Sequence, residues 1–267
     1  MAESTLSLGF ADFQREVGHY LGFGYDPDNY SSDQTSEVDF IVQSGYRRFL
    51  NPPLVPGESV SHEWNFLSPV ASLSVLSATD PADYDMPDDF GSLVGSMSIN
   101  TANILNSPIT QIPEGKLRSL RADETTSSYS FRPQYVAIRP KAGFDGTTGT
   151  RYEALIYPQP DANYTLNYKY NVLVGKLSTS APYPLGGASR GELVLQSCLS
   201  IAEQRRDEAS GVQTQLFYEM LKAAVDSDRA ALPDTFGYVG DGSDKSNLSQ
   251  EDLYRRQSSI DVSALTT

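Results

Sequence analysis

The chain has 267 residues, which is long enough for one large domain or two modest ones around a sizeable core. Its formal net charge is −14, and this acidity disfavours a protein that clamps nucleic-acid phosphates, because such binding needs clustered Lys and Arg. The single cysteine, Cys198, excludes an intrachain disulfide, and no apolar run approaches the ~20 residues that a membrane-spanning helix needs.

A first helix is predicted near the N-terminus. One apolar face repeats there at spacings close to 3.6 residues and consists of Leu6, Phe10, Phe13, Val17 and Leu21. We expect Thr5 to cap this helix and Gly22 or Gly24 to end it. The same segment has no basic region followed by an apolar stretch, so it does not predict a secretory signal, and we expect synthesis in a cytoplasm.

A second helix has the clearest period in the chain. Its buried face is predicted to consist of Val38, Ile41, Val42, Gly45, Tyr46 and Phe49. Ser36 and Asp39 resemble a capping box, which places the start of the helix near Ser36. The Asn-Pro-Pro sequence at residues 51–53 ends it, because a helix rarely continues through the residue before a proline.

From about residue 60 to residue 174 the pattern changes to short strands. Apolar runs bounded by Pro, Asp and Gly predict them: HEWNF, ASLSVL, SLVGSMSI, YVAIRP, RYEALIYP and NYTLNYKYNVL. A short helix is predicted over residues 114–122, and Asp145-Gly146 predicts a hairpin loop. Short antiparallel strands joined by loops favour a small sandwich or barrel.

The last of these runs alternates between large and polar side chains. One face carries Tyr164, Leu166, Tyr168 and Tyr170. We expect this face to be buried in the core of a sheet. The alternative is an exposed aromatic row that stacks on sugars or bases.

Helical periodicity returns at about residue 188. Its apolar stripe consists of Leu195, Cys198, Leu199 and Ala202, widened by Val194 and Ile201. After Gly211 a fourth helix is predicted, with a stripe of Leu216, Phe217, Met220, Leu221 and Ala224. Two helices therefore follow the strands, as two precede them.

This order of elements predicts an α+β protein in which an antiparallel β-rich domain is inserted into a helical bundle. We assign residues 1–56 and 182–235 to the bundle, 57–181 to the insert and 236–267 to an extended C-terminal arm. The bundle core is predicted to contain Phe10, Phe13, Val17, Val38, Ile41, Val42, Phe49, Leu195, Leu199, Phe217 and Leu221. The arm is polar without a core pattern, so it is either a flexible end or a segment that orders on a partner.

Catalytic signatures are scarce. The sequence has no Walker loop and no Gly-x-Ser-x-Gly motif, and for its two histidines, His19 and His62, we expect ordinary packed or solvated roles. The acidic stretch DPADYDMPDD at residues 80–89 lacks the ligand spacing of a calcium loop. We therefore predict no enzyme, cofactor or metal. A hydrolase with a carboxylate pair stays open as an alternative, because the chain has 34 acidic residues.

Three stretches resemble head-to-tail connector, or adaptor, proteins of tailed bacteriophages. They are EVGHYLGFG, VDFIVQSGYRRFLNPP and the region from RYEALIYPQPD to PYPLGGASRGELVLQSCLSIAEQRRDE. The resemblance spans residues 6–235 and lies in a pattern of two helices, a β-rich insert, a strand that ends in Tyr-Pro-x-Pro-Asp, then Pro-x-Pro-Leu-Gly-Gly and two more helices.

The resemblance implies a structural virion protein, made in the bacterial host cytoplasm, that forms a homo-oligomeric ring of usually twelve copies at the head-tail interface. The ring would sit under the portal protein, extend the channel through which DNA passes without sequence-specific binding, and dock the tail or the next connector protein, with no membrane contact. Family members grip the portal with a C-terminal arm. The implied contacts here are Leu248, Leu253, Tyr254, Arg255, Arg256 and Ile260.

Two points stay open at the level of sequence. The pair Arg255-Arg256 is expected either to be solvated or to dock on an acidic partner. A carbohydrate-binding or receptor-binding β-rich phage protein, which would use the tyrosine-rich strands, is the alternative function.

Overall fold

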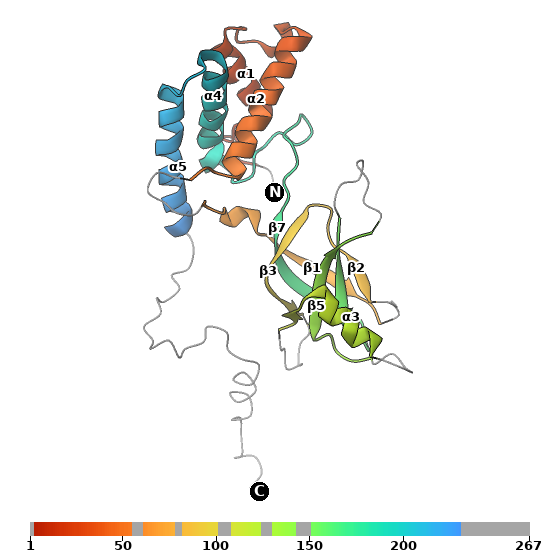
Figure 1. Cartoon of the computed structure of the whole chain (residues 1–267). Coiled ribbons are helices and arrows are strands. Elements are labelled where there is room, and N and C mark those ends of the chain that lie inside the picture. Colours follow the sequence, from red (N-terminus) through yellow and green to blue (C-terminus); the bar gives the residue numbers. More distant parts are fainter. Residues whose placement is uncertain are drawn as a thin grey trace, which may run out of the picture. The chain divides into compact units, whose positions relative to one another are not determined.

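The structure, a computed structural model, describes residues 3–54, 61–77, 82–100, 108–123, 130–142 and 151–230. The chain divides into two compact units (Figure 1). The helical unit comprises the described residues of Met1–Leu67 and Val174–Asp234, and the β unit comprises those of Ser68–Leu173. The predicted α+β class is confirmed. The predicted arm, residues 236–267, lies outside the described residues.

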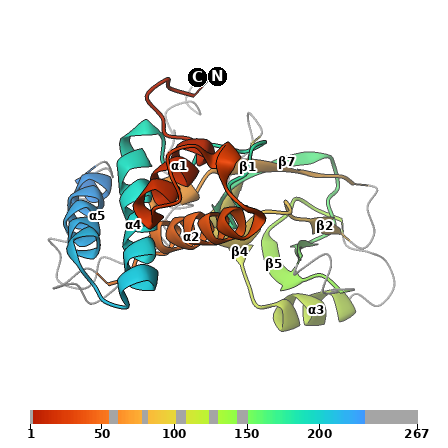
Figure 2. The same cartoon turned by 90° about the horizontal axis from the view of Figure 1, so that it is seen from above.

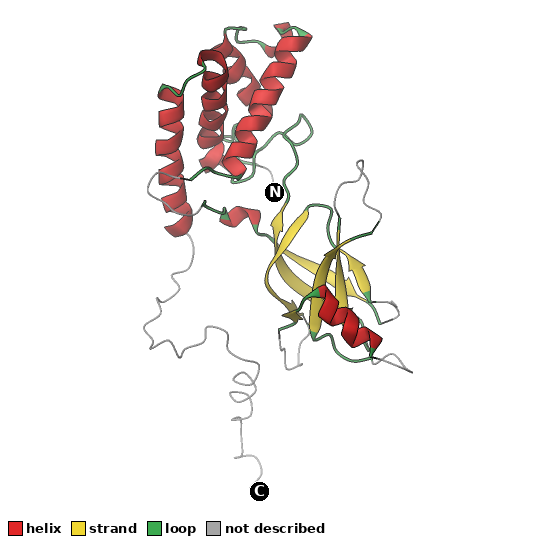
Figure 3. Ribbon diagram, viewed as in Figure 1, coloured by secondary structure: helices red, strands yellow, loops and turns green. Residues whose placement is uncertain are grey.

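The described part of the helical unit consists of α-helices and short 3-10 helices (Figure 3). Its elements are α1 (Phe10–Leu21), η1 (Pro27–Asn29), α2 (Ser32–Leu50), η2 (Asn65–Leu67), η3 (Ala188–Arg190), α4 (Gly191–Asp207) and α5 (Val212–Ala230). α4 packs against α1, α2 and α5, and Figure 2 shows α5 on one side of α4 with α1 and α2 on the other. Helices from the two ends of the chain therefore share one core.

Most predicted core residues lie in one buried cluster of this unit. The buried residues are Phe10, Phe13, Val17, Val38, Ile41, Val42, Phe49, Phe217 and Leu221. Leu195 and Leu199 are only partly buried and pack against that cluster. Leu216 is 41% exposed, so its placement in the buried stripe of α5 was wrong. Consecutive helical residues point about 100° apart, so Leu216 faces away from the core although its neighbour Phe217 faces into it.

The first helix begins later than predicted. Its N-cap is Gly9, so Thr5 and Leu6 precede the helix. The Asp12 carboxylate accepts a hydrogen bond from the Gly9 N–H at 2.9 Å, and the N–H of the first helical residue donates to the Pro182 carbonyl at 2.8 Å. The contact with Pro182 joins segments far apart in the chain, so a local pattern does not contain it.

The second helix begins earlier than predicted. Ser31 and Gln34 form its capping box: the Gln34 N–H donates to Ser31 Oγ, and the Ser31 N–H donates to Gln34 Oε1 at 2.9 Å. Ser36 lies inside the helix, where its hydroxyl donates to the Ser32 carbonyl at 2.8 Å. Two similar serine motifs stand one after the other here, and the prediction chose the second.

α2 and α4 approach each other closely where Gly45 meets Cys198. A Cβ atom on Gly45 would lie 2.6 Å from both the Cα and the Sγ of Cys198. Ser197 Oγ donates to the Gly45 carbonyl at 2.8 Å, which adds a polar bond to the contact. The missing side chain of Gly45 thus allows the two backbones to touch, and Cys198 is a buried core residue, as predicted.

The boundaries of the β unit differ from the predicted residues 57 and 181. HEWNF is not a strand, because Trp64 packs on Phe49 in the helical core and its Nε1–H donates to the Phe49 carbonyl at 2.7 Å. At the other boundary Gln43 binds both backbone groups of Leu177, with distances of 2.7 Å to the carbonyl and 3.1 Å to the N–H. The chain therefore belongs to the helical unit before Pro182.

The described part of the β unit contains two sheets. One has the order β1-β7-β3 and consists of β1 (Val70–Val75), β7 (Tyr164–Val172) and β3 (Phe90–Ile99). The other has the order β2-β6-β5-β4 and consists of β2 (Asp83–Asp85), β6 (Tyr152–Tyr157), β5 (Tyr135–Pro140) and β4 (Thr110–Gln111). The pairs are antiparallel except β4–β5, which is parallel. The predicted hairpin loop at Asp145-Gly146 lies outside the described residues.

The two sheets share one hydrophobic core. Leu166, Tyr168 and Tyr170 of β7 are buried with Val136 and Ile156 of the second sheet. The alternation predicted for the tyrosine-rich strand is therefore confirmed, and its large residues face inward.

α3 (Glu114–Ala122), at the residues where a short helix was predicted, packs on the second sheet. Ala137 lies opposite Leu155 in the β5–β6 register, and both are buried with Leu117 of α3. Because neighbouring strand residues point to opposite faces, α3 covers the face that does not meet the first sheet.

Candidate docking surfaces

Phe40 lies on the outward side of α2 and is 54% exposed. Arg47 and Arg205 flank its ring, with guanidinium carbons 6.0 and 4.8 Å from the ring centroid. Both arginines lie in the last turns of their helices, where a cation also complements the helix dipole. We term these three residues the Phe40 surface. Aromatic residues and arginine are enriched at the energetic centres of protein contacts, so this surface is a candidate contact site.

α5 carries apolar residues on the side that faces away from α4. Val212 is 75% exposed and Leu216 is 41% exposed, and the exposed Ala223 continues the same side two turns further on. The opposite side contributes Phe217 and Leu221 to the core. We term Val212, Leu216 and Ala223 the α5 outer face. A solvated helix face is usually polar, so the apolar α5 outer face is a second candidate contact site.

Glu203 holds the start of α5 against α4. Its carboxylate accepts hydrogen bonds from the backbone N–H groups of Gly211, Gln213 and Thr214 at 3.0, 3.0 and 2.9 Å, and from Thr214 Oγ1 at 2.8 Å. Burial alone would raise the pKa of Glu203, but these bonds to the ionised form outweigh burial and lower the pKa. An ionised carboxylate thus caps α5, and the α5 outer face has a fixed orientation.

Arg48 joins α2 to both C-terminal helices. Its guanidinium donates to Ser200 Oγ at 3.0 Å and to the Tyr218 hydroxyl at 3.4 Å, and it lies 4.6 Å from the centroid of the Phe217 ring. The helices that carry the Phe40 surface and the α5 outer face are therefore connected through one side chain.

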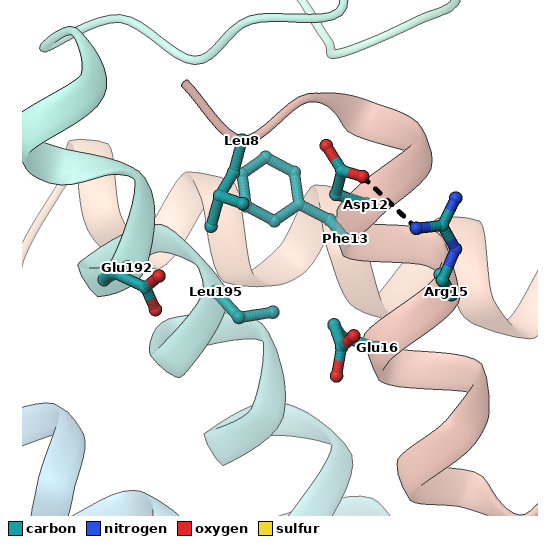
Figure 4. A pocket seen from close by; sticks show the side chains of 7 residues that line it. All are labelled: Leu8, Asp12, Phe13, Arg15, Glu16, Glu192 and Leu195. Atoms are coloured by element: carbon teal, nitrogen blue, oxygen red, sulfur yellow. Dashed lines mark ion pairs between the residues drawn. The ribbon is translucent and has the colours of Figure 1, made fainter. Parts of the chain in front are cut away.

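A pocket lies between α4 and the N-terminal half of α1. Figure 4 shows the seven lining residues, with Glu192 and Leu195 of α4 facing α1: Leu8, Asp12, Phe13, Arg15, Glu16, Glu192 and Leu195. Its volume is about 380 Å³. The lining combines apolar side chains with three carboxylates and one guanidinium. We term it the Glu192 pocket, and its composition suits an apolar group that carries a positive charge.

The β unit engages its acidic residues in ion pairs. Asp83 Oδ1 accepts from Arg121 at 2.7 Å and Asp83 Oδ2 lies 3.3 Å from Arg139, while Arg139 Nε donates to Glu153 at 2.6 Å. Asp85, from the stretch considered as a calcium loop, pairs with a lysine at 2.7 Å. Within the described residues no cluster of His, Cys, Asp and Glu is arranged to hold a metal ion.

The tyrosine row of β7 does not form an exposed platform. Tyr168 and Tyr170 are buried, and the hydroxyl of Tyr170 donates to Asp89 at 3.2 Å. Burial raises the pKa of Tyr168 to about 12, and burial together with a hydrogen bond to Asp161 raises the pKa of Tyr164 to about 12. This face therefore serves the sheet core.

The two histidines lie in different settings. His19 is exposed on α1 and its ring lies 5.4 Å from that of Tyr25. His62 Nε2 lies 2.8 Å from Asp228 Oδ2, and the Asn65 amide also donates to Asp228. The contacts of His62 and Asn65 with Asp228 connect the C-terminal end of α5 to the start of η2 and to the segment that precedes it. No local sequence pattern indicated them.

No protein-family model matches this chain. A search of curated proteins also found no match. Among the helices in the described residues, none combines the length and the apolar character needed to cross a bilayer. The predicted arm contacts lie outside the described residues, namely Leu248, Leu253, Tyr254, Arg255, Arg256 and Ile260. The Phe40 surface and the Glu192 pocket were missed by sequence reasoning, and the one available signal was a phenylalanine on the polar side of a regular helix.

Proposed function

We propose that the protein is a structural virion protein of a tailed bacteriophage, which forms a head-to-tail connector ring under the portal and docks the tail. In this proposal twelve copies surround the DNA channel, as the resemblance of the sequence implies. The chain performs no catalysis, and residues 240–267 grip the portal protein. The acidic composition lets DNA pass, because a wall poor in clustered cations holds phosphates weakly.

The observation that carries the proposal is the pair of unlike surfaces on one helical unit. A closed ring of identical copies needs a heterologous interface, in which two different faces of each copy are complementary. The Phe40 surface is aromatic and cationic, with Arg47 and Arg205. The α5 outer face is apolar, and the exposed Glu219 and Asp226 lie beside it on the same helix. We assign these two surfaces to each other in neighbouring copies.

The β unit offers less support for the alternative functions. A carbohydrate binder that used the tyrosine-rich strand would need exposed rings, and Tyr168 and Tyr170 are buried. A hydrolase would need a pair of carboxylates free to exchange protons, and within the β unit Asp83 and Glu153 do not form such a pair, because both are bound to arginines.

Mass photometry of the full chain, alone and with the portal protein of the same phage, tests the proposal. Charge at either surface is expected to abolish ring assembly, so we choose Phe40→Glu and Leu216→Glu. Leu54→Glu is the matched control, because Leu54 is also 54% exposed but lies on neither surface. Far-ultraviolet circular dichroism confirms that each variant is folded.

A mixture of the two variants distinguishes a ring with heterologous interfaces from an assembly in which each surface contacts its own copy. Each variant retains one intact surface, so Phe40→Glu and Leu216→Glu together are expected to form heterodimers that cannot close. A wild-type chain that stays monomeric beside its portal contradicts the proposal. So does a ring that both substitutions leave intact.

A further inference from the structure

The Glu192 pocket carries negative charge that its own residues do not balance. Asp12 lies 3.6 Å from Arg15, and Glu16 accepts a hydrogen bond from the Tyr25 hydroxyl at 3.0 Å. Glu192 is exposed and, among the described residues, makes neither a hydrogen bond nor an ion pair. Three carboxylates therefore face one guanidinium, which favours a cationic occupant.

The apolar part of the pocket also lacks a cover within the described residues. Leu8 and Leu195 pack against the helical core but are only partly buried. They line the same 380 Å³ space as the carboxylates. A ligand for this pocket must cover these leucines with apolar atoms and place a positive charge against the carboxylates. An arginine next to apolar residues meets both requirements.

The chain itself contains such a segment beyond the described residues. Residues 253–256 read Leu-Tyr-Arg-Arg, and apart from their two arginines the only cation after residue 230 is Lys245. The leucine and the tyrosine supply apolar surface, and the arginines supply two charges against the excess of carboxylates. Arginine also binds carboxylates with two parallel hydrogen bonds, which a lysine cannot do.

The last described residue before this segment is Ala230, at the C-terminal end of α5. α5 runs antiparallel to α4, so its C-terminal end lies toward the end of the unit where α4 begins with Glu192 (Figure 1). Two interhelical spacings separate α5 from α1, which is roughly 20 Å. A coil of the length of residues 231–252 has a root-mean-square span of about 25 Å, so the segment reaches the pocket without being fully extended.

We propose that residues 253–256 dock in the Glu192 pocket of their own chain, with Arg255 and Arg256 against the Glu16 and Glu192 carboxylates and Leu253 or Tyr254 over Leu8 and Leu195. A tethered segment has an effective concentration in the millimolar range, so a weak contact is sufficient. The docked arginines are unavailable to other partners until a competing acidic surface releases them. This contact belongs to the free chain and does not depend on the proposed ring.

Distance measurement between two spin labels tests the proposal in the full chain. We would label Ser189→Cys, an exposed residue three positions before Glu192, and Gln257→Cys, after the arginine pair. The native Cys198 stays unlabelled, because it is fully buried and burial raises the pKa of its thiol to about 12. A narrow short-distance component is expected, and it should be lost with Arg255→Glu plus Arg256→Glu, or with Glu192→Lys.

Three comparisons complete the test. Lys245→Glu, outside residues 253–256 in the sequence, and Asp207→Lys, at the opposite end of α4 from Glu192, are charge controls and should leave the short component intact. The charge swap Glu192→Lys with Arg256→Glu should recover part of it, and 0.5 M salt should weaken it. A broad distribution in the unchanged chain overturns the proposal. A short component that vanishes when labelled chains are diluted with unlabelled ones also overturns it, because the occupant is then a second copy.

Discussion

Selected charged and aromatic residues of the β unit are paired or buried, whereas selected ones of the helical unit are exposed. In the β unit, Asp83 and Glu153 are paired with arginines, and the tyrosines of β7 are buried. In the helical unit, Phe40 is exposed between two arginines and Glu192 has no ion-pair partner among the described residues. These acids of the β unit are thus neutralised within the unit, whereas the helical unit leaves Phe40 and Glu192 exposed, and for that reason the candidate contact sites are assigned to the helical unit.

Breaking the core of the helical unit should have the largest effect. Phe49 is fully buried, stacks with Phe66 and contacts the tilted ring of Trp64, so Phe49→Ala should lower the free energy of unfolding by about 4 kcal/mol. Phe40→Ala, on the same helix but exposed, should change it by less than about 0.5 kcal/mol. Urea unfolding measures both, and equal losses would show that the assigned faces of α2 are wrong.

The second prediction concerns the buried carboxylate that caps α5. Glu203→Gln should lower the free energy of unfolding by about 2–3 kcal/mol at pH 7, because an uncharged amide meets the backbone N–H groups of Gly211, Gln213 and Thr214 less well. Asp207→Asn is the control, since Asp207 is an exposed acid on the same helix. Urea unfolding at pH 7 compares the three proteins.

The effect of Glu203 should depend on pH in one direction. The pKa of Glu203 is lower in the folded chain than its ordinary value of 4.5, so its contribution is complete above about pH 4.5 and is lost as pH falls through the folded pKa. The difference in the free energy of unfolding between wild type and Glu203→Gln should therefore narrow progressively as the pH falls below 4.5. A gap of constant size down to pH 3 would contradict the assigned cause.

The regular parts of this fold followed from the sequence. The 3.6-residue period identified the buried face of α2, and alternation identified the inward tyrosines of β7. Gly22, named as a possible end of α1, does end it, with a φ of 84° that glycine tolerates. These features depend on neighbours within one element, which is the information that a local pattern contains.

The errors arose where distant segments decide the structure. HEWNF has the aromatic content of a strand, but Trp64 finds its partner in Phe49 of α2. Leu216 fits a helical stripe, and only the packing of α5 on α4 shows that it faces outward. The Glu192 pocket combines residues 8–16 with residues 192–195, so no window of sequence contains it.

The smallest predicted effect tests whether the ion pairs of the β unit serve only its stability. Arg139 bonds Glu153 and Asp83, so Arg139→Gln should cost about 1 kcal/mol of β-unit stability, while Arg118→Gln, whose side chain is 73% exposed, should cost almost nothing. Both variants should assemble as the wild type does, because neither residue belongs to the Phe40 surface or to the α5 outer face. A folded Arg139→Gln chain that no longer assembles would contradict this expectation. The ion pairs of Arg139 would then hold a contact surface of the β unit in place, and the proposed contact between copies would have to be assigned to the β unit.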